Sequence, residues 1–433
     1  MFGFIMSSRR VVIGSLITLT LLLGCDAPPS VPVVPESDAG TPASNTNINP
    51  LIKATSNTPP GSIDKTPPTA ADADAVAQMS HIMYGMNIGN YMDQPGQPTN
   101  ANASQCSLSG PPSEGAGAGG GKLGGWMFEA IKQAGFDHVR LTVNWNCHTG
   151  HDAGAGATDI DTAWFARIDW AIAHVLTRGM VLVLDMHNNW DYFNKLPGER
   201  EKLVSMWAQI AEHYKDYPKQ LYLEILNEPP YGFDTAQWGQ DLAACIQAVR
   251  ASNPYRTIVY GGTDFNKAYT LPALDTYLPT DDKNLIATVH YYSPYCFTHG
   301  QTWDCTRTYG TAYDSTKPNV QWPSPYTAAE ADAGDAVADK MVALVKSDFD
   351  ATQQTSTQIG RPIYVGEFGA MGTRDLQSRG AYTAAVVQAA EQRGMAWADW
   401  GFVNTQFDAW NGAVGWYPPI ISALRPEYTV PTN

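Results

Sequence analysis

The chain of 433 residues is poor in charged residues and lacks clusters of basic ones. Charged residues make up 16% of it, and 42 Asp and Glu against 27 Lys and Arg give a formal net charge of −15. Proteins bind nucleic acids and anionic lipids mainly through clustered Lys and Arg, so we expect neither as the main partner. Aromatic residues, in contrast, make up 11% of the chain. This composition favours an uncharged ligand that stacks on aromatic rings.

The first apolar run, residues 11–24, is too short to span a bilayer as a helix, which takes about 20 residues. It follows Arg9 and Arg10 and has the length of a signal-peptide core. It ends in Leu22-Leu23-Gly24-Cys25, which resembles a bacterial lipobox. We therefore expect residues 1–25 to be a lipoprotein signal peptide with Cys25 as the lipidated residue. A signal peptide cut elsewhere and a twin-arginine signal at Ser8-Arg9-Arg10 are the alternatives.

Residues 26–72 have no aromatic residue and hold 10 of the 30 prolines. Such a segment cannot bury enough apolar area to offset its conformational entropy, so it is expected to be a disordered linker. All 13 tryptophans lie at or after Trp126. Residues 73–433 are therefore expected to form one large folded domain.

Cysteine is scarce, with six in the chain. We expect one disulfide between Cys296 and Cys305, which flank a short segment, and a second between Cys106 and Cys147, as is usual in exported proteins. Cys245 lies on the apolar face of a predicted helix and is expected to be free and buried. No two cysteines have the C-x2-C spacing of zinc sites, and we expect neither a metal nor a cofactor.

Short apolar runs alternate with stretches of helical period through the folded part. Several runs, such as Val181-Leu182-Val183-Leu184, are continuously apolar, which is typical of strands buried on both faces of a parallel sheet. The predicted strands are residues 83–88, 138–145, 180–187, 221–228, 256–261, 285–292, 362–368 and 395–402. The predicted helices are residues 126–134, 163–178, 199–214, 235–251, 328–351 and 377–392. This α/β pattern predicts a (β/α)8 TIM barrel, with a doubly wound open sheet as the alternative.

Most of the predicted strands carry polar or aromatic residues that could bind a ligand or take part in catalysis, mainly at their carboxyl ends. In a parallel barrel these ends converge on one mouth, where such folds place their active sites. The residues are Arg140, His187, Asn227, Glu228, His290, Tyr292, Glu367 and Trp400. A single carboxylate there could be a helix cap, and Glu224 is expected to be structural. Eight such residues, of six types and on six predicted strands, are much harder to explain as caps.

Two motifs carry a family resemblance: Leu226-Asn227-Glu228-Pro229 and Val365-Gly366-Glu367-Phe368-Gly369. Together with Gly85-Met86-Asn87-Ile88-Gly89-Asn90 and His290-Tyr291-Tyr292 they resemble the glycoside hydrolases of family 5, across about residues 79 to 425. The resemblance implies retaining hydrolysis, in which two carboxyl groups lie about 5 to 5.5 Å apart. It makes Glu228 the acid/base and Glu367 the nucleophile.

The same resemblance implies the roles of the other residues. Arg140 would keep Glu367 ionised, and Tyr292 would orient that carboxylate. Asn227 would hold the sugar 2-hydroxyl, while His187 and His290 would form hydrogen bonds near the cleaved bond. Trp400 would stack on the sugar, and Trp303 and Asn87 are further candidates for substrate contacts. His299 belongs to the same loop as Trp303.

The expected protein is a retaining endo-β-1,4-glucanase without a cofactor, acting on a β-linked polysaccharide. β-Mannanase or xyloglucanase activity is the nearest alternative, and a non-catalytic glycan-binding protein is a different class. We expect a monomer that is exported, either secreted or attached to the membrane only through Cys25.

Three other possible functions, namely nucleotide binding, metal binding and Ser-His-Asp catalysis, are not supported by the sequence. Residues 117–122 are glycine-rich but lack the Ser or Thr of a phosphate-binding loop. His148, His151 and Asp152 are not accompanied by further metal ligands. No G-x-S-x-G motif supports Ser-His-Asp catalysis.

Overall fold

The computed structural model describes residues 56–93, 104–107, 122–187, 189–299, 335–403, 405–412 and 415–429. All of them belong to one compact unit, residues 47–433. Cys25, Cys305, Trp303 and the side chain of Cys296 lie outside the described residues, so the predicted lipidation and the Cys296–Cys305 bridge do too.

Eight parallel strands form a closed barrel in sequence order, β1 to β8. Their bounds are β1 Tyr84–Met92, β2 His138–Val143, β3 Val181–Met186, β4 Leu221–Glu224, β5 Ile258–Gly261, β6 Leu285–Tyr291, β7 Ile363–Phe368 and β8 Trp397–Asp399. Apart from Tyr84 and Asn90, every residue of these strands is buried, as their apolar runs require. The predicted (β/α)8 barrel is confirmed, and the open sheet is excluded.

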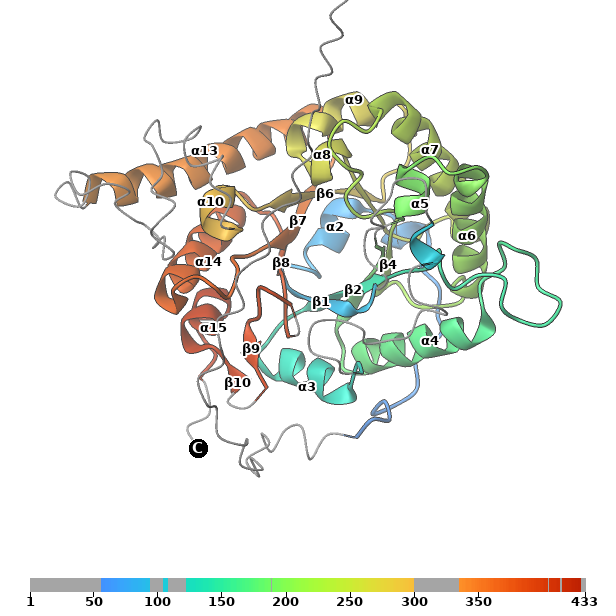
Figure 1. The fold of residues 1–433 in the computed structure, drawn as a ribbon, viewed down its shortest axis with the longest axis horizontal. Helices are drawn as coiled ribbons and strands as arrows, with labels where there is room; N and C mark the ends of the chain where they lie inside the picture. Colours follow the sequence, from blue (N-terminus) through green and yellow to red (C-terminus); the bar gives the residue numbers. More distant parts are fainter. Residues whose placement is uncertain are drawn as a thin grey trace, which may run out of the picture. The chain divides into compact units, whose positions relative to one another are not determined.

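Helices surround this barrel (Figure 1). The longer ones are α3 Gly125–Gln133, α4 Thr162–Leu176, α6 Glu199–His213, α7 Thr235–Ser252, α13 Asp335–Ile359, α14 Leu376–Glu391 and α15 Pro418–Leu424. Short elements lie between them: α5 Trp190–Phe193, α8 Thr263–Asn266, α9 Leu271–Asp275, α10 Tyr295–Thr298 and the 3-10 turns η1 Ala70–Asp72, η2 Gln105–Ser107 and η3 Ala268–Thr270. The large apolar core fills the space between strands and helices.

A short helix, α2 (Ala75–Met79), closes the amino-terminal end of the barrel. Its Ala75 and Met79 pack with residues from the starts of strands, including Val181 and Ile286. A two-stranded sheet of β9 (Trp410–Asn411) and β10 (Gly415–Trp416) follows β8. With one end of the barrel closed by α2, the carboxyl ends of the strands form the mouth that is left for a ligand.

Several predicted boundaries are wrong. β4 ends at Glu224, so Asn227 and Glu228 lie in the loop after the strand. β8 ends at Asp399, one residue before Trp400. The predicted helix at residues 328–351 appears as α13, which extends to Ile359; residues 328–334 are outside the described part.

The predicted linker also extends too far toward the domain. The backbone carbonyl of Asn57 accepts a 2.8 Å hydrogen bond from Trp170, and its side chain accepts one of 3.0 Å from the Gly125 backbone. Lys65 lies over the Tyr217 ring, 4.4 Å from its centre, and Asp72 pairs with Lys219 at 2.8 Å. Residues 56–72 therefore lie against the barrel, because they form hydrogen bonds, a cation–π contact and an ion pair with α3, α4 and the loop before β4.

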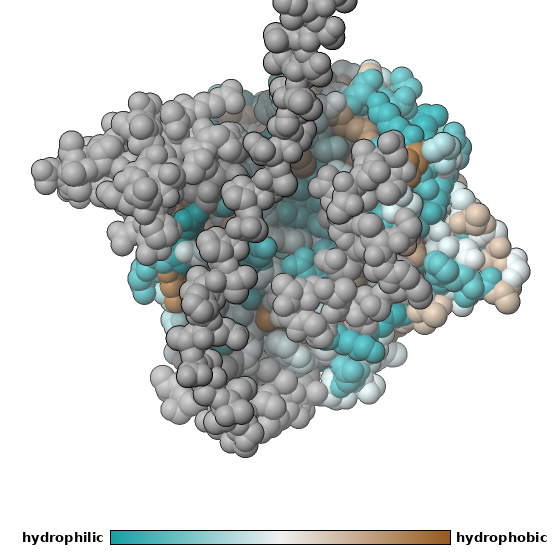
Figure 2. Space-filling model, viewed as in Figure 1, coloured by the Kyte–Doolittle hydropathy of each residue, from teal (hydrophilic) through white to brown (hydrophobic). Residues whose placement is uncertain are grey.

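Within the described residues, no helix is both long and apolar enough to cross a membrane. On the coloured part of the face in Figure 2, hydrophilic residues predominate over hydrophobic ones.

Candidate active site

Strand register brings the predicted polar residues together. Asn87 on β1 pairs with Arg140 on β2, Asp185 on β3 pairs with Glu224 on β4, and His290 on β6 pairs with Glu367 on β7. Neighbouring strands of a parallel barrel hold paired residues at the same height. The site is thus assembled from the strands themselves, with loops adding Asn227, Glu228, Tyr292 and Trp400.

Glu228 has a left-handed backbone conformation, with φ of 44°. This conformation is uncommon for a residue other than glycine and costs about 1 kcal/mol or more. It occurs four residues after the end of β4, next to Asn227. The turn carries the Glu228 carboxyl group into the mouth of the barrel.

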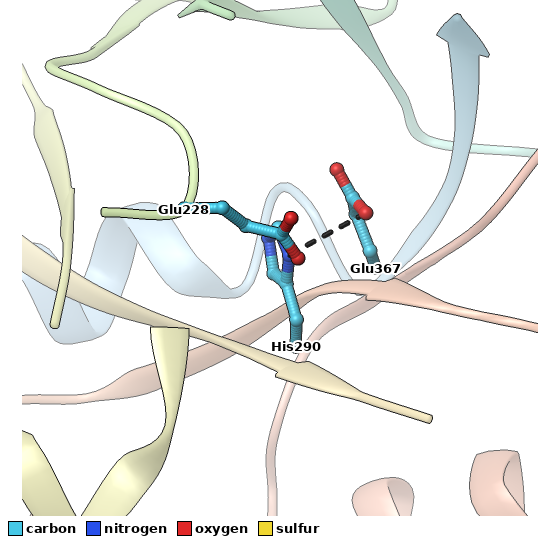
Figure 3. A group of neighbouring side chains, drawn as sticks. All are labelled: Glu228, His290 and Glu367. Carbon is cyan, nitrogen blue, oxygen red and sulfur yellow. Dashed lines mark hydrogen bonds and ion pairs between the residues drawn. The ribbon is translucent and has the colours of Figure 1, made fainter. Parts of the chain in front are cut away.

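The carboxyl groups of Glu228 and Glu367 point toward one another, with the imidazole of His290 beside them (Figure 3). One oxygen of each lies within 4.8 Å of the other and of a His290 nitrogen. The Nδ1 atom of His290 is 2.7 Å from Oε1 of Glu228 and 3.4 Å from Oε2 of Glu367. Retaining glycosidases have carboxyl groups about 5 to 5.5 Å apart, whereas inverting ones leave about 6.5 to 9.5 Å for a water. The short separation favours direct attack by one carboxylate.

Arg140 is fully buried and organises the carboxylates below the mouth. Its guanidinium donates to Oε1 of Glu367 at 2.7 Å and to both oxygens of Glu224 at 2.8 and 2.9 Å. It also donates to Asn227 at 2.8 Å and lies 3.1 Å from Asp185. Burial alone would lower the pKa of Arg140, but these three carboxylates raise it above its usual range. The positive charge is therefore fixed beside Glu367.

The two catalytic candidates differ in their hydrogen-bond partners. Burial raises the pKa of both Glu228 and Glu367. Glu367 accepts hydrogen bonds from Arg140 and, at 3.0 Å, from the hydroxyl of Tyr292, and both bonds favour its ionised form. Glu228 has neither contact and faces His290 instead. Of two close carboxyl groups, these partners favour the charge on Glu367 and the proton on Glu228.

His187 and Trp400 form a polar and aromatic wall of the same site. Nδ1 of His187 is 2.6 Å from Asp185, and its other ring nitrogen is 3.8 Å from Asp93. Burial alone would lower the pKa of His187, but the nearby carboxylates, Asp185 above all, raise it to about 9. Its ring stacks against Trp400 with 5.7 Å between centres. A Cβ atom at Gly89 would lie 2.4 Å from the Trp400 ring, so this close approach requires glycine there.

A cavity of about 720 Å³ opens above these groups. His187, Glu228, Tyr292, Glu367 and Trp400 line it. Three well-exposed rings, Tyr231, Phe265 and Tyr269, line it as well, and we call them the aromatic rim. The volume lies within the range of about 300 to 1,000 Å³ for small-molecule sites.

The model of the cellulase family, glycosyl hydrolase family 5, matches residues 92–406. The chain belongs to this family. Among curated relatives, it is 28% identical over 380 residues to the cellulase/esterase CelE of Acetivibrio thermocellus, covering 82% of this chain and 40% of the relative. It is 30% identical over 276 residues to endoglucanase H of the same organism, covering 64% and 26%. The chain spans less than two thirds of the length of either relative.

Solved structures of family 5 enzymes agree with the barrel. Thermotoga maritima Cel5A in complex with cellobiose is 28% identical, with a TM-score of 0.64, covering 81% of this chain and 100% of that one. The same enzyme in complex with mannotriose gives the same identity, TM-score and coverage.

Not every predicted residue of this family 5 chain reaches the cavity. Asn87 is fully buried, its amide nitrogen donates to the Gly366 carbonyl at 2.9 Å, and its oxygen accepts from Arg140 at 3.0 Å. Asn87 therefore supports Arg140, and the expectation that it contacts substrate is wrong. Arg140 itself has no exposed surface. Asn227 is 1% exposed, and His299 lines the cavity.

Cys106 and Cys147 form a disulfide, and Cys245 is free and buried. The bridge holds residues 104–107 against the loop after β2. Asp191 of α5 accepts hydrogen bonds from Ser104 and the Gln105 backbone, each at 2.6 Å. Residues 104–107 are thus held by the disulfide and by Asp191 together.

Among the described residues, metal binding is disfavoured at two places where it could be considered. Glu228, His290 and Glu367 have the spacing of a cation site, but Arg140 and protonated His187 already place positive charge beside it. His148 stacks on Trp164 with 3.5 Å between ring centres, and His151 pairs with Asp161 at 2.7 Å. The histidines of that loop are thus occupied by separate partners.

The sequence reasoning missed Asp185 as a partner of His187, the aromatic rim and Asn266. Asp185 could have been found, because it lies two residues before His187 and side chains two apart share a face of a strand. Tyr231 lies three residues after Glu228, which was a weak signal. The conformation of residues 264–266 left no signal, since none of them is glycine.

Proposed function

We propose that this chain is a retaining endo-β-1,4-glucanase. The observation that carries the proposal is the pair of carboxyl groups, Glu228 and Glu367, whose oxygens lie within 4.8 Å across a cavity lined by aromatic rings. A retaining reaction needs one protonated and one ionised carboxyl group at this spacing. A glycan-binding protein without turnover has no need of both.

The reaction takes two steps. In the first, Glu228 donates its proton to the glycosidic oxygen while a carboxylate oxygen of Glu367 attacks the anomeric carbon. The bond to the leaving sugar breaks, and a covalent glycosyl-enzyme forms. In the second step, ionised Glu228 takes a proton from water, whose oxygen attacks the anomeric carbon and releases Glu367. Both steps pass through a transition state with positive charge on the sugar.

The surrounding groups fit this sequence of steps. Arg140 and Tyr292 hold Glu367 ionised and oriented through bonds of 2.7 and 3.0 Å. Trp400 and His187 provide the wall on which the attacked sugar stacks. The aromatic rim begins three residues after the acid Glu228, so it would hold the sugars on the leaving side. Asn227 would bind the 2-hydroxyl group.

The choice of β-1,4-glucan rests on the relatives. Endoglucanase H of Acetivibrio thermocellus and the cellobiose complex of Thermotoga maritima Cel5A point to glucan. The mannotriose complex of the same enzyme keeps β-mannan as the second candidate. Cleavage chemistry is common to both sugars, and selectivity depends on the loops around the mouth.

The test is hydrolysis of four soluble polysaccharides: carboxymethylcellulose, barley β-glucan, galactomannan and xyloglucan. We expect release of reducing ends from the two glucans, and a loss of at least about 10³-fold in kcat/KM for Glu367→Gln because the nucleophile is removed. Glu201→Gln, an exposed residue of α6, is the matched control and should retain activity. Undiminished activity of Glu367→Gln would overturn the mechanism, and activity on galactomannan alone would overturn the substrate.

We also propose that the chain is exported, anchored by lipid at Cys25 and monomeric, with a flexible tether between anchor and barrel. The lipobox-like Leu22-Leu23-Gly24-Cys25 supports this. Growth of a producing bacterium with a labelled fatty acid should label the wild-type chain but not Cys25→Ser. Equal labelling of both would contradict the anchor.

A further inference from the structure

Three consecutive residues after β5 adopt the left-handed conformation, although none is glycine. The φ angles of Asp264, Phe265 and Asn266 are 55°, 60° and 57°. Asn and Asp tolerate this conformation in single positions, whereas Phe does not favour it. Contacts in the folded protein must therefore hold the segment in place.

Those contacts tie the segment to the loop that carries Glu228. The backbone N–H of Phe265 donates to the carbonyl of Pro229 at 2.9 Å, and Pro229 directly follows Glu228. The carboxylate of Asp264 accepts from the Gly232 backbone at 2.9 Å and from the Tyr269 hydroxyl at 2.6 Å. The loop and the left-handed segment form one hydrogen-bonded unit.

Asn266 is the residue of this segment that points inward. It is fully buried, and its amide nitrogen lies 3.2 Å from Nε2 of His290. A Cβ atom at Gly261 would lie 2.1 Å from the Asn266 amide oxygen, so glycine is required for Asn266 to approach His290. The left-handed conformation and the glycine together place one amide against one imidazole nitrogen.

His290 connects Asn266 to the carboxyl pair. Its other nitrogen, Nδ1, is 2.7 Å from Oε1 of Glu228. Burial lowers the pKa of His290 to about 4, so the ring is neutral and carries one N–H. When the amide of Asn266 donates to Nε2, that proton must be on Nδ1, from which it donates to Glu228. Oε1 of Glu228 is then an acceptor, and Oε2 is left to carry the proton for the leaving group.

We propose that Asn266 is a positioning residue, which fixes the tautomer of His290 and through it the orientation of the Glu228 acid. It does not line the cavity and touches no reacting atom. This inference rests on the proposed hydrolase function.

Several charged groups face Glu228 from the surrounding elements. They are Arg140 from β2, His187 after β3, His290 from β6, Glu367 from β7 and Lys267 after α8. A substitution of Asn266 leaves all of them in the chain. In a variant that adds no charge, such as Asn266→Gly, a change in the protonation of Glu228 would therefore come through the imidazole of His290.

The experiment compares two cellobiosides with the full-length chain and Asn266→Gly. Glycine adopts positive φ without cost, so the backbone is kept while the amide is removed. One substrate, cellotriose, has a sugar leaving group that needs the proton of Glu228; the other, 2,4-dinitrophenyl cellobioside, has a leaving group that departs without it. We expect kcat/KM to fall about 10-fold or more on cellotriose and less than about 3-fold on the aryl substrate.

A second variant, Asn266→Asp, keeps the size of the side chain and replaces the donor by an acceptor. The new carboxylate favours a protonated His290, whose positive charge lowers the pKa of Glu228. The basic limb of the pH profile of kcat/KM on cellotriose should move to lower pH. Lys195→Gly, at another left-handed position on the loop after α5, controls for loss of a side chain at positive φ and should leave both rates unchanged.

Equal losses on both substrates for Asn266→Gly, with an unshifted basic limb for Asn266→Asp, would overturn the positioning role and leave Asn266 merely structural. A wild-type chain that turns over neither cellobioside would instead overturn the proposed function, and this inference with it.

Discussion

Arg140 is the buried cation that faces most of the carboxyl groups of the site. Its single positive charge faces Asp185, Glu224 and Glu367, and protonated His187 adds a second. Carboxyl groups therefore outnumber cationic side chains around Arg140 and His187. An excess of fixed negative charge stabilises a transition state in which the sugar becomes positive, and no solvent has to reorganise to provide it.

The hydroxyl of Tyr292 allows the protonation of Glu367 to be tested separately. Tyr292→Phe removes a 3.0 Å hydrogen bond that favours the ionised carboxylate, so the pKa of Glu367 should rise. The acid limb of the pH profile of kcat/KM should then move to higher pH by about one unit, the equivalent of about 1.4 kcal/mol. Tyr291→Phe is the matched control, because the hydroxyl of Tyr291 donates to Asp348 on α13. An acid limb that stays in place would show that Tyr292 does not act on Glu367.

For single residues, the sequence predicted which residues belong to the site better than it predicted the orientation of their side chains. The positions of Glu228 and Glu367 followed from strand ends that meet at one mouth, although Glu228 lies in the loop after β4. The burial of Asn87 could not be predicted, since it depends on three carbonyl groups of β7 and β8 that approach its amide. The same holds for Asn266, whose position depends on a left-handed backbone conformation that the residue types at 264–266 do not predict.

Among the elements, the strands were the most predictable and the loops the least. Short apolar runs identified all eight strands, and several of these runs are continuously apolar because burial on both faces leaves that pattern. Strand ends were missed at β4 and β8, where the backbone leaves the sheet to present Glu228 and Trp400. The pair β9 and β10, two residues each, was too short to give a period.

The Cys106–Cys147 disulfide joins residues 104–107 covalently to the loop after β2. It closes a stretch with a sequence separation of 41. Loss of the bridge should lower the free energy of unfolding by up to about 4 kcal/mol, because the unfolded chain gains freedom. Denaturant unfolding of Cys106→Ser, Cys147→Ser and the double variant measures this. Each single variant should cost about as much as the double one; additive costs would mean that the two residues act independently.

For the whole molecule, the boundary between linker and domain is earlier than its composition indicated. The proline-rich composition of residues 26–72 is uniform, yet residues 56–72 find partners such as Trp170, Tyr217 and Lys219. Composition indicates how much apolar area a segment can bury within itself, but it does not predict the contacts that the segment makes with a neighbouring surface.

A truncation series tests this boundary. A chain of residues 73–433 should be less stable than one of residues 56–433 by about 2 kcal/mol, since the hydrogen bonds of Asn57 each contribute about 0.5 to 1.5 kcal/mol. Thermal unfolding of the two chains gives the difference. Equal thermal-unfolding midpoints would mean that residues 56–72 do not stabilise the domain, and that the domain begins after residue 72.

The central claim is that Glu367 attacks the sugar directly, with Glu228 as acid and then base. Proton NMR of the first products formed from a soluble cello-oligosaccharide tests it most directly, because two displacements at the anomeric carbon restore its configuration. Double displacement yields the β-anomer first and the α-anomer later, by spontaneous mutarotation. Initial formation of the α-anomer would mean a single displacement by water and would rule out attack by Glu367.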